Sequence, residues 1–319
     1  MTAPPPIFTL SPATHFWSFE LAMASSTATT AAKKVLVVGG TGFLGLNVCR
    51  VAAMKGWEVV SLSRRGLQPS YDHGTPDWAE KVTWVSGDSL EPSTYAEHLV
   101  GAHSVIHTVG ILMEADYKRV VRSRTVGEFV EGVKGLVRRD RGNPLKRERE
   151  EEGVTFERMN RDTASLGFRR YNFTPPDLVH PAITIARTAA AIPTIESFVY
   201  VSAMDIFPFV DPRYITTKRE AERFLLAKDE FRTVVLRPGF IYSDNRPFTV
   251  PLATALSMTN RLISPIKRDV ASLPLGSAIT TPPLHVDTVA RAAIAGAERE
   301  GLKAILEAEG ILELAAGKV

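Results

Sequence analysis

The sequence contains a single cysteine, Cys49, in 319 residues. One cysteine excludes an internal disulfide and argues against a thiolate metal site. No apolar run approaches the roughly 18 uncharged positions that a membrane-spanning helix needs, so no membrane span is expected. The net charge is only +3, with a pI near 8.9, which is too weakly basic to indicate nucleic-acid binding. What remains is an ordinary globular composition, with 45% hydrophobic and 23% charged residues.

Residues 1–32 also lack what a folded core needs. The Ser/Thr/Ala-rich stretch 24–32 offers few large apolar side chains, so a disordered N-terminal extension is expected. Glu20 is its one acid, as in an organelle presequence, but no Arg or Lys precedes Lys33, which is unlike a presequence. These residues therefore leave targeting undecided.

A glycine-rich turn joins the first expected strand to the first expected helix. The apolar run 35–38 is typical of a buried strand, and apolar residues at helical spacing follow over 46–54. Strand, glycine turn and helix in this order are the context of a dinucleotide-binding fingerprint, in which amides at the helix N-terminus hold a pyrophosphate. The alternative is a chance glycine-rich turn. The cofactor contacts expected here are Gly39, Thr41, Gly42, Phe43, Leu44 and Gly45.

Strands alternate with helices through much of the chain. Further strands are expected at 57–63, 82–86, 104–107, 197–202 and 233–237, and helices at 156–166, 182–191 and 214–228. Short strands separated by helices need crossover connections, so we predict an α/β fold with a Rossmann-type doubly wound parallel sheet. Residues 33–240 are expected to form this NAD(P)-binding domain, and residues 241–319 a smaller C-terminal lobe for substrate or partner.

A basic insertion at 114–153 interrupts this alternation and ends in the charge run 146–152. It is read either as a solvated surface loop or as a docking element for a partner. RNA binding is disfavoured, because acidic residues interrupt the basic ones and few aromatics lie among them.

Tyr214 and Lys218 are the strongest candidates for chemistry. They stand four residues apart on the expected helix 214–228, so their side chains share one face. A phenol with a pKa of about 10 is a poor acid or base at neutral pH, and a nearby ammonium lowers that pKa. Ser202, at the end of a strand, would hold a substrate oxygen. Tyr-x-x-x-Lys alone arises by chance in many helices, but behind a dinucleotide turn it predicts a catalytic set of Ser202, Tyr214 and Lys218.

The residues after the second strand bear on the choice of nicotinamide cofactor. An acid at this position would bind a ribose 2′-hydroxyl and repel a 2′-phosphate. The chain instead has Ser63 followed by Arg64 and Arg65, and a guanidinium can bind a phosphate through two hydrogen bonds. NADP(H) is therefore favoured over NAD(H); the alternative is that both arginines are solvated turn residues.

Further candidates follow the later strands. The remaining expected cofactor contacts are Asp88, Ser89, Thr108, Val109, Gly110 and Pro238. His107 is interpreted as a packed histidine rather than a catalytic one, and Asp287 as the cap of a helix over 288–298. No His, Asp or Glu cluster has the spacing of metal ligands, so no metal is expected.

Several motifs resemble one family, the extended or atypical short-chain dehydrogenase/reductases. They are the glycine turn 39–45, Gly87-Asp88, the Ser202, Tyr214 and Lys218 set, and Leu236-Arg-Pro-Gly239. The resemblance covers about residues 33–300 apart from the insertions. Segments 61–66, 106–112, 142–146 and 239–242 are similar to the branch with the NADPH-binding accessory subunit of respiratory complex I and a fungal mitochondrial member associated with coenzyme Q biosynthesis.

The resemblance implies an NADP(H)-binding oxidoreductase that acts in ubiquinone (coenzyme Q) biosynthesis within the Q-biosynthetic complex. Its implied partners are other Q-biosynthesis proteins, a hydrophobic quinone-like molecule and the surface of the mitochondrial inner membrane on the matrix side. One alternative is a catalytically silent, NADPH-bearing structural or assembly subunit; a more distant one is a nucleotide-sugar epimerase or dehydratase. The side chains that would line a quinone pocket, or equally pack in a core, are Phe207, Phe209, Leu252, Leu256, Met258 and Leu262.

The arginine pair yields a test of cofactor choice. Arg64→Ala is expected to weaken NADPH binding by about tenfold to a hundredfold, the value of a charge-assisted hydrogen bond, and to change NADH binding little. Titration calorimetry with both nucleotides measures the two losses. Equal losses, or none, would contradict the assignment.

Overall fold

The computed structural model describes residues 32–72, 74–109, 180–204, 212–246, 249–263 and 280–318. The chain separates into two units, Met1–Ala31 and Ala32–Val319. The elements described here all lie in the second unit. The predictions for residues 1–31, the insertion 114–153, the helix 156–166 and Gly110 lie outside the described residues.

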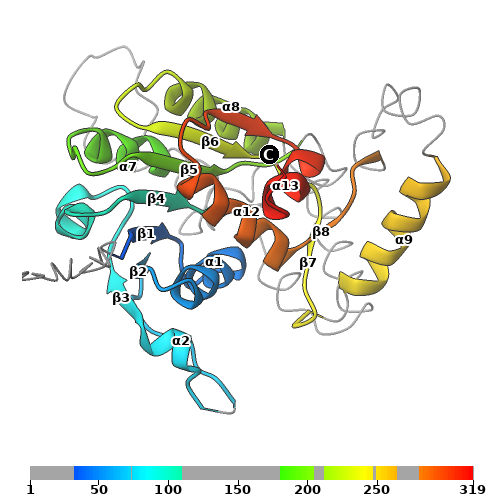
Figure 1. The fold of residues 1–319 in the computed structure, drawn as a ribbon, viewed down its shortest axis with the longest axis horizontal. Helices are drawn as coiled ribbons and strands as arrows, with labels where there is room; N and C mark the ends of the chain where they lie inside the picture. The colour runs from blue at the N-terminus through cyan, green and yellow to red at the C-terminus, as the bar shows by residue number, and fades with distance from the viewer. Residues whose placement is uncertain are drawn as a thin grey trace, which may run out of the picture. The chain divides into compact units, whose positions relative to one another are not determined.

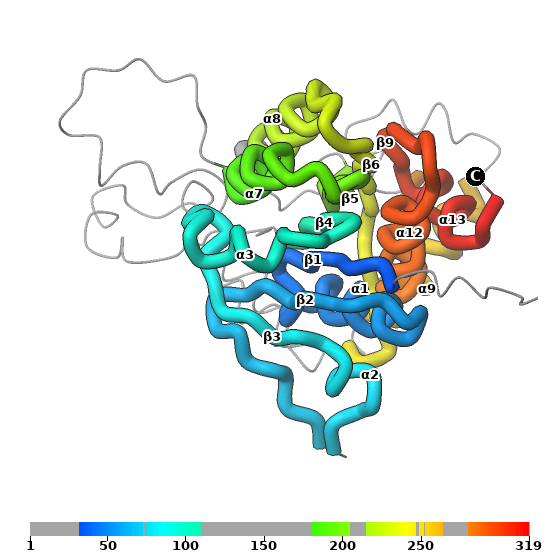
Figure 2. The backbone as a smooth tube through the Cα atoms, turned by 60° about the vertical axis from the view of Figure 1, so that its left-hand side comes forward, coloured from blue at the N-terminus to red at the C-terminus, as the bar shows by residue number. Residues whose placement is uncertain are grey.

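Seven parallel strands form the main sheet, in the order β3-β2-β1-β4-β5-β6-β9 (Figure 2). Their bounds are β1 Lys34–Val38, β2 Glu58–Ser63, β3 Val82–Ser86, β4 Ser104–His107, β5 Ser197–Val201, β6 Arg232–Leu236 and β9 Ala304–Leu306. The strand order reverses between β1 and β4, which is where ligands bind in sheets of this kind. The predicted Rossmann-type parallel sheet is confirmed.

Helices cover both faces of the sheet (Figure 1). One apolar cluster joins the sheet to α1 Phe43–Met54, α12 Val286–Glu298 and α13 Ala308–Ala315, and a second joins it to α7 Pro181–Ala190 and α8 Pro212–Leu226. The remaining elements are α2 Asp77–Glu80, η1 Pro92–Thr94, α3 Ala96–Leu99, α9 Thr249–Leu262, and the strands β7 Ile241–Tyr242 and β8 Leu284–His285, which pair with each other.

Alternation along the strands assigns side chains to the two faces. In β5, Val199 packs on the α1 and α12 side, whereas Phe198 and Tyr200 pack on the α7 and α8 side. Every residue of β5 is buried, which explains why the sequence shows a continuous apolar run rather than strict alternation. Cys49, inside α1, is also fully buried, and burial raises the pKa of its thiol to about 12. It packs in the core and is not poised to react.

The C-terminal part of the chain returns to the sheet. The sequence assigns 241–319 to a lobe beyond it, whereas the structure places β9 beside β6 and packs α12 on the sheet. The strand β9 has only three residues, which is too few to show the alternating pattern from which a strand is predicted. The prediction that Asp287 caps α12 is wrong: the Nδ1 atom of His285 accepts from the Asp287 N–H at 3.3 Å. Asp287 instead pairs with Arg50 of α1 at 2.7 Å.

Within the described ranges, no helix combines the length and the apolar composition that crossing a membrane requires. The same ranges contain no group of three or more His, Cys, Asp or Glu side chains placed to hold a metal ion.

Gly45 provides a stability test of the turn between β1 and α1. A Cβ atom at this position would lie 2.1 Å from the Gly39 carbonyl oxygen and 2.8 Å from Thr108 Oγ1. Gly45→Ala is therefore expected to lower the free energy of unfolding by about 1–3 kcal/mol, measured by urea denaturation. The matched control is Gly310→Ala in α13, where the nearest atom is the flexible Leu306 Cδ2 at 3.2 Å. The control should be neutral or stabilising through helix propensity. Equal stability of Gly45→Ala and wild type would contradict the close contact.

Candidate functional site

The glycine turn presents an open helix N-terminus at the carboxyl edge of the sheet. Gly39 follows β1 with a φ of 84°, a conformation that favours glycine. The Gly42 N–H donates to the Gly39 carbonyl at 2.8 Å, and α1 begins directly after Gly42 with no side-chain cap and no acid in its first turn. Among the described residues, the amides of Phe43, Leu44 and Gly45 find no acceptor. These residues fit the pyrophosphate of a dinucleotide.

The second strand ends at the same edge with two exposed arginines. The Ser63 Oγ accepts from the Gly66 N–H at 3.2 Å, and the Ser86 Oγ donates to the Arg64 carbonyl at 3.1 Å. The backbone of this turn is thus fixed by β2 and β3. The side chains of Arg64 and Arg65 face solvent and pair with no carboxylate in the described part of the chain.

The other expected cofactor contacts lie after β3, β4 and β6. Asp88 is exposed, and its Oδ1 accepts from the Leu90 N–H at 3.0 Å, so it closes its own turn; Ser89 is half-buried beside it. Thr108 Oγ1 donates to the Val38 carbonyl at 2.8 Å, which holds the end of β4 against β1. Pro238 is buried.

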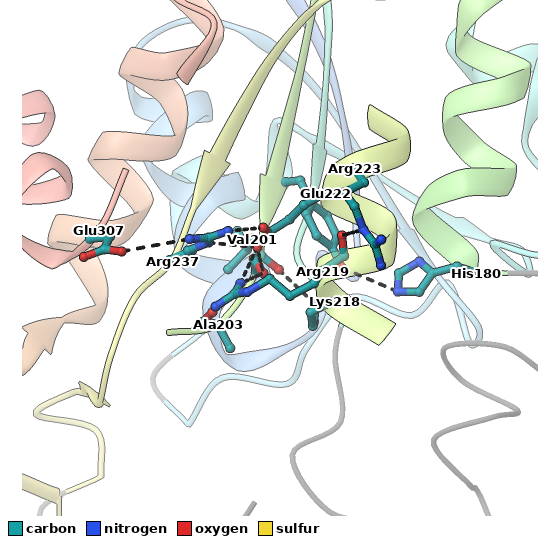
Figure 3. A network of polar contacts seen from close by, with 11 residues as sticks. His180, Val201, Ala203, Lys218, Arg219, Glu222, Arg223, Arg237 and Glu307 are labelled. Atoms are coloured by element: carbon teal, nitrogen blue, oxygen red, sulfur yellow. Dashed lines mark hydrogen bonds and ion pairs between the residues drawn. The ribbon is translucent and has the colours of Figure 1, made fainter. Parts of the chain in front are cut away.

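Lys218 lies at the centre of the candidate site, beside Val201 at the end of β5 (Figure 3). Its side chain is 1% exposed, and its Nζ donates to the Val201 carbonyl at 2.9 Å and the Val109 carbonyl at 3.0 Å. The same atom lies 4.7 Å from the centre of the Tyr200 ring. Burial lowers the pKa of Lys218 to about 7, although the negative charge of Glu222 works against this shift. Tyr214 occupies α8 one turn earlier, and its side chain lies outside the described residues.

The hydroxyl of Ser202 donates to Oε1 of the buried Glu222 carboxylate. Two arginines donate to Oε1 of Glu222 as well: Arg237 Nε at 3.1 Å and Arg219 Nη1 at 2.5 Å. Arg219 further donates to the Ala203 carbonyl at 3.0 Å. The hydroxyl hydrogen of Ser202 is thus directed into the protein.

Four charged or polar side chains therefore form one network, which we call the Glu222 cluster: Ser202, Arg219, Glu222 and Arg237. Burial raises the pKa of Glu222, but hydrogen bonds from Arg237 and Ser202, together with the charges of both arginines, outweigh burial and hold the pKa below its usual value. Sequence analysis assigned no role in the site to Glu222 or Arg237. Their positions could have pointed to the site, because Glu222 follows Lys218 by four residues on one helix and Arg237 directly follows β6.

Two buried histidines flank Lys218 on the other side. His107 is the register partner of Tyr200, with ring centres 5.6 Å apart. Neither ring nitrogen of His107 has a hydrogen-bond partner among the described residues. His180 caps α7 by accepting from the Ala182 N–H at 3.1 Å. Burial, helped by the charge of Lys218, lowers the pKa of His180 to about 3 and that of His107 well below its usual value. Both rings are therefore neutral at physiological pH.

The apolar side chains considered for a quinone pocket are only partly within the described chain. On α9, Leu256 is half-buried, whereas Met258 and Leu262 are 62% and 82% exposed. Core packing therefore does not account for Met258 or Leu262. Phe207, Phe209 and the side chain of Leu252 lie outside the described residues.

The Glu222 cluster yields a pH-resolved stability test. Glu222→Gln removes the charge that balances Arg219 and Arg237, whose side chains are 26% and 20% exposed. The expected loss is about 2–4 kcal/mol at pH 7, slightly below that for breaking a fully buried pair. Because the pKa of Glu222 is lowered by folding, this contribution is present above its unfolded pKa of about 4.3 and disappears as the pH falls through the folded value.

Denaturant unfolding of wild type and variant between pH 7 and pH 3 measures this difference. Glu220→Gln, on the same helix, is the control and should change stability little. A Glu222→Gln protein as stable as wild type at pH 7 would show that the cluster does not stabilise the fold.

Three comparisons report known proteins to which this chain is similar. Residues 35–128 match the model of the NAD dependent epimerase/dehydratase family. MIOREX complex component 2 of Saccharomyces cerevisiae is 29% identical over 88% of this chain and 99% of its own length. An uncharacterized chloroplastic protein of Arabidopsis thaliana is 29% identical over 89% of this chain and 78% of its own. The Bordetella bronchiseptica enzyme WbmF, solved with NAD+, gives a TM-score of 0.49 at 16% identity, covering 90% of this chain and 78% of that one. Taken with the strand order and the glycine turn, the sequence matches show that the chain has the epimerase/short-chain dehydrogenase fold and resembles the atypical members of that superfamily.

Proposed function

We propose that this protein binds NADP(H) at the switch between β1 and β4 and acts as a short-chain dehydrogenase-type oxidoreductase within an organellar protein complex. The observation that carries the proposal is the open N-terminus of α1 next to a buried lysine. Thr108 holds the end of β4 against β1, and the adjacent Val109 carbonyl accepts from Lys218. The phosphate-binding turn and the candidate acid/base helix are therefore linked through two consecutive residues.

A bound nicotinamide would supply the hydride. The chain would hold the cofactor through the amides of Phe43, Leu44 and Gly45 and through the residues that end β2 and β4. Tyr214 would donate or accept the proton, and Lys218, one turn further along α8, would lower the pKa of its phenol. A lysine whose own pKa is about 7 is partly charged at neutral pH, so it can respond to a change in the charge beside it.

Arg64 and Arg65 support NADP(H) over NAD(H). Both side chains are exposed at the end of β2, and neither is committed to a carboxylate in the described ranges. A 2′-phosphate would find two cations there, and no acid replaces Ser63 to select a 2′-hydroxyl.

The proposed setting rests on relatives and on resemblance. One relative is named as a component of the MIOREX complex and another as chloroplastic. These names support partners in a protein complex and an organellar location for this chain. The sequence resemblance to the coenzyme Q-associated branch supports a hydrophobic quinone-like substrate, other Q-biosynthesis proteins as partners and peripheral contact with the inner membrane on the matrix side.

A second function is favoured by Ser202. Because its hydroxyl donates to Glu222, it is not placed to donate to a substrate oxygen as the sequence predicts. This arrangement supports a subunit that holds NADPH for structural integrity and catalyses no turnover. For a nucleotide-sugar epimerase or dehydratase, the supporting observation is the family match of residues 35–128, and no contact among the described residues favours a sugar substrate.

Purified full-length protein distinguishes these functions. If the protein is an oxidoreductase, it is expected to exchange bound NADPH with added NADPH and to consume it when a soluble short-chain quinone is supplied. The loss of nicotinamide absorbance measures this consumption. Tyr214→Phe is then expected to lower turnover by about 10²- to 10⁴-fold, the contribution of a general acid or base, with the Kd for NADPH unchanged. Tyr71→Phe, a tyrosine replacement outside α8, is the control and should leave turnover unchanged. NADPH that binds but is not consumed would support the structural subunit, and absence of nucleotide binding would contradict both functions.

A further inference from the structure

Arg246 contacts the glycine turn from the C-terminal part of the chain. It lies in the segment between β7 and α9, and its guanidinium carbon is 3.9 Å from the ring centre of Phe43, the first residue of α1. This is a cation–π contact at stacking distance. It brings a positive side chain to the helix end whose first amides lack acceptors within the described chain.

The backbone of Arg246 is fixed by three hydrogen bonds. Its N–H donates to the Ser243 carbonyl at 3.0 Å, and its own carbonyl accepts from Thr249 N–H and Oγ1 at 2.8 and 2.6 Å. The side chain thus projects from a closed turn. Such a turn limits the entropy that the arginine would lose on binding a ligand.

The acids of the neighbouring segments do not neutralise this arginine. Asp244, in the same turn, lies 3.6 Å from the Nε2 atom of His285, and Asp287 pairs with Arg50 at 2.7 Å. Within the part of the chain that the structure describes, the guanidinium of Arg246 forms no hydrogen bond or ion pair. Burial lowers its pKa, and no acid counters that effect. A partly buried cation without a counter-ion favours an anionic ligand.

The glycine turn itself needs such a cation. Residues 39–45 contain no Lys or Arg, so the turn offers only amides and the dipole of α1 to a doubly charged pyrophosphate. A guanidinium matches phosphate oxygens in charge and in planar geometry. Arg246 would supply the charge that the turn lacks.

We propose that Arg246 binds the pyrophosphate of the dinucleotide held by the glycine turn. The proposal rests on the proposed function and adds a phosphate ligand from outside the first half of the sheet. Phe43 would then be the platform that orients the guanidinium toward the pyrophosphate.

Two ligands that share adenosine and the 2′-phosphate test this assignment. NADPH contains the pyrophosphate, whereas adenosine 2′-monophosphate does not. Arg246→Gln is expected to weaken NADPH binding by about 10- to 100-fold and to change adenosine 2′-monophosphate binding by less than about twofold, since only the pyrophosphate contact is lost. Arg64→Ala should weaken both ligands. Titration calorimetry on the full chain measures all four affinities, with Arg261→Gln on the exposed face of α9 as the matched control.

Inorganic pyrophosphate separates the cofactor from a phosphate-bearing substrate as the source of the anion. If Arg246 serves the cofactor, pyrophosphate binds the nucleotide-free protein in an Arg246-dependent manner and is displaced by NADPH. Arg246-dependent pyrophosphate binding that persists in NADPH-saturated protein would overturn the assignment and indicate a second phosphate ligand.

Thermal unfolding without nucleotide checks that Arg246→Gln is folded, and Arg246→Lys provides a second variant. Lysine keeps the charge but loses the planar fork, so it should restore part of the NADPH affinity. Wild type that binds NADPH while folded Arg246→Gln binds it equally well would overturn the role of Arg246 and leave the proposed function standing. Wild type that binds no dinucleotide would instead refute the proposed function.

Discussion

The site depends on the absence of a side chain at Gly45. With a Cβ atom 2.1 Å from the Gly39 carbonyl, α1 would have to move away from the end of β1. Because Thr108 bonds to β1 and Val109 to Lys218, such a shift would also displace the start of the loop after β4 and the contact with α8. One tight helix–strand approach therefore fixes the relative positions of the anion-binding amides and the buried lysine.

Lys218 and Glu222 show how a helix can bring opposite charges into a protein interior with different outcomes. They are one turn apart on α8, and both are at most 2% exposed. Glu222 contacts two guanidinium groups and stays ionised, whereas Lys218 donates to backbone carbonyls and lies near an aromatic ring and two neutral histidines, and the charge of Glu222 offsets only part of its burial. Neutral partners offset less of the desolvation cost. The ammonium is thus left close to losing its proton, and the carboxylate is not.

Local pattern predicted the sheet well because each strand of the first half is short, apolar and bounded by turn residues. Motif spacing also led us to expect Lys218 and the glycine turn in one site, because Tyr-x-x-x-Lys behind a dinucleotide turn is typical of such sites. It did not predict the Glu222 cluster, the contact of Arg246 with Phe43 or the capping by His285. Each of these contacts depends on tertiary packing or on exact backbone geometry. Neither leaves a periodic pattern in the sequence from which the contact could be predicted. The short strand β9 was missed for the related reason that three residues cannot display alternation.

The position of β9 affects how the chain reaches its folded state. The sheet gains its outermost strand, and α1 its helical neighbour α12, only from residues near the end of the sequence. During synthesis, the apolar side of the nascent N-terminal half therefore stays uncovered until residues 286–306, which form α12 and β9, have been made. Such long-range closure slows folding and leaves the unfinished chain open to association with other chains until α12 and β9 have docked.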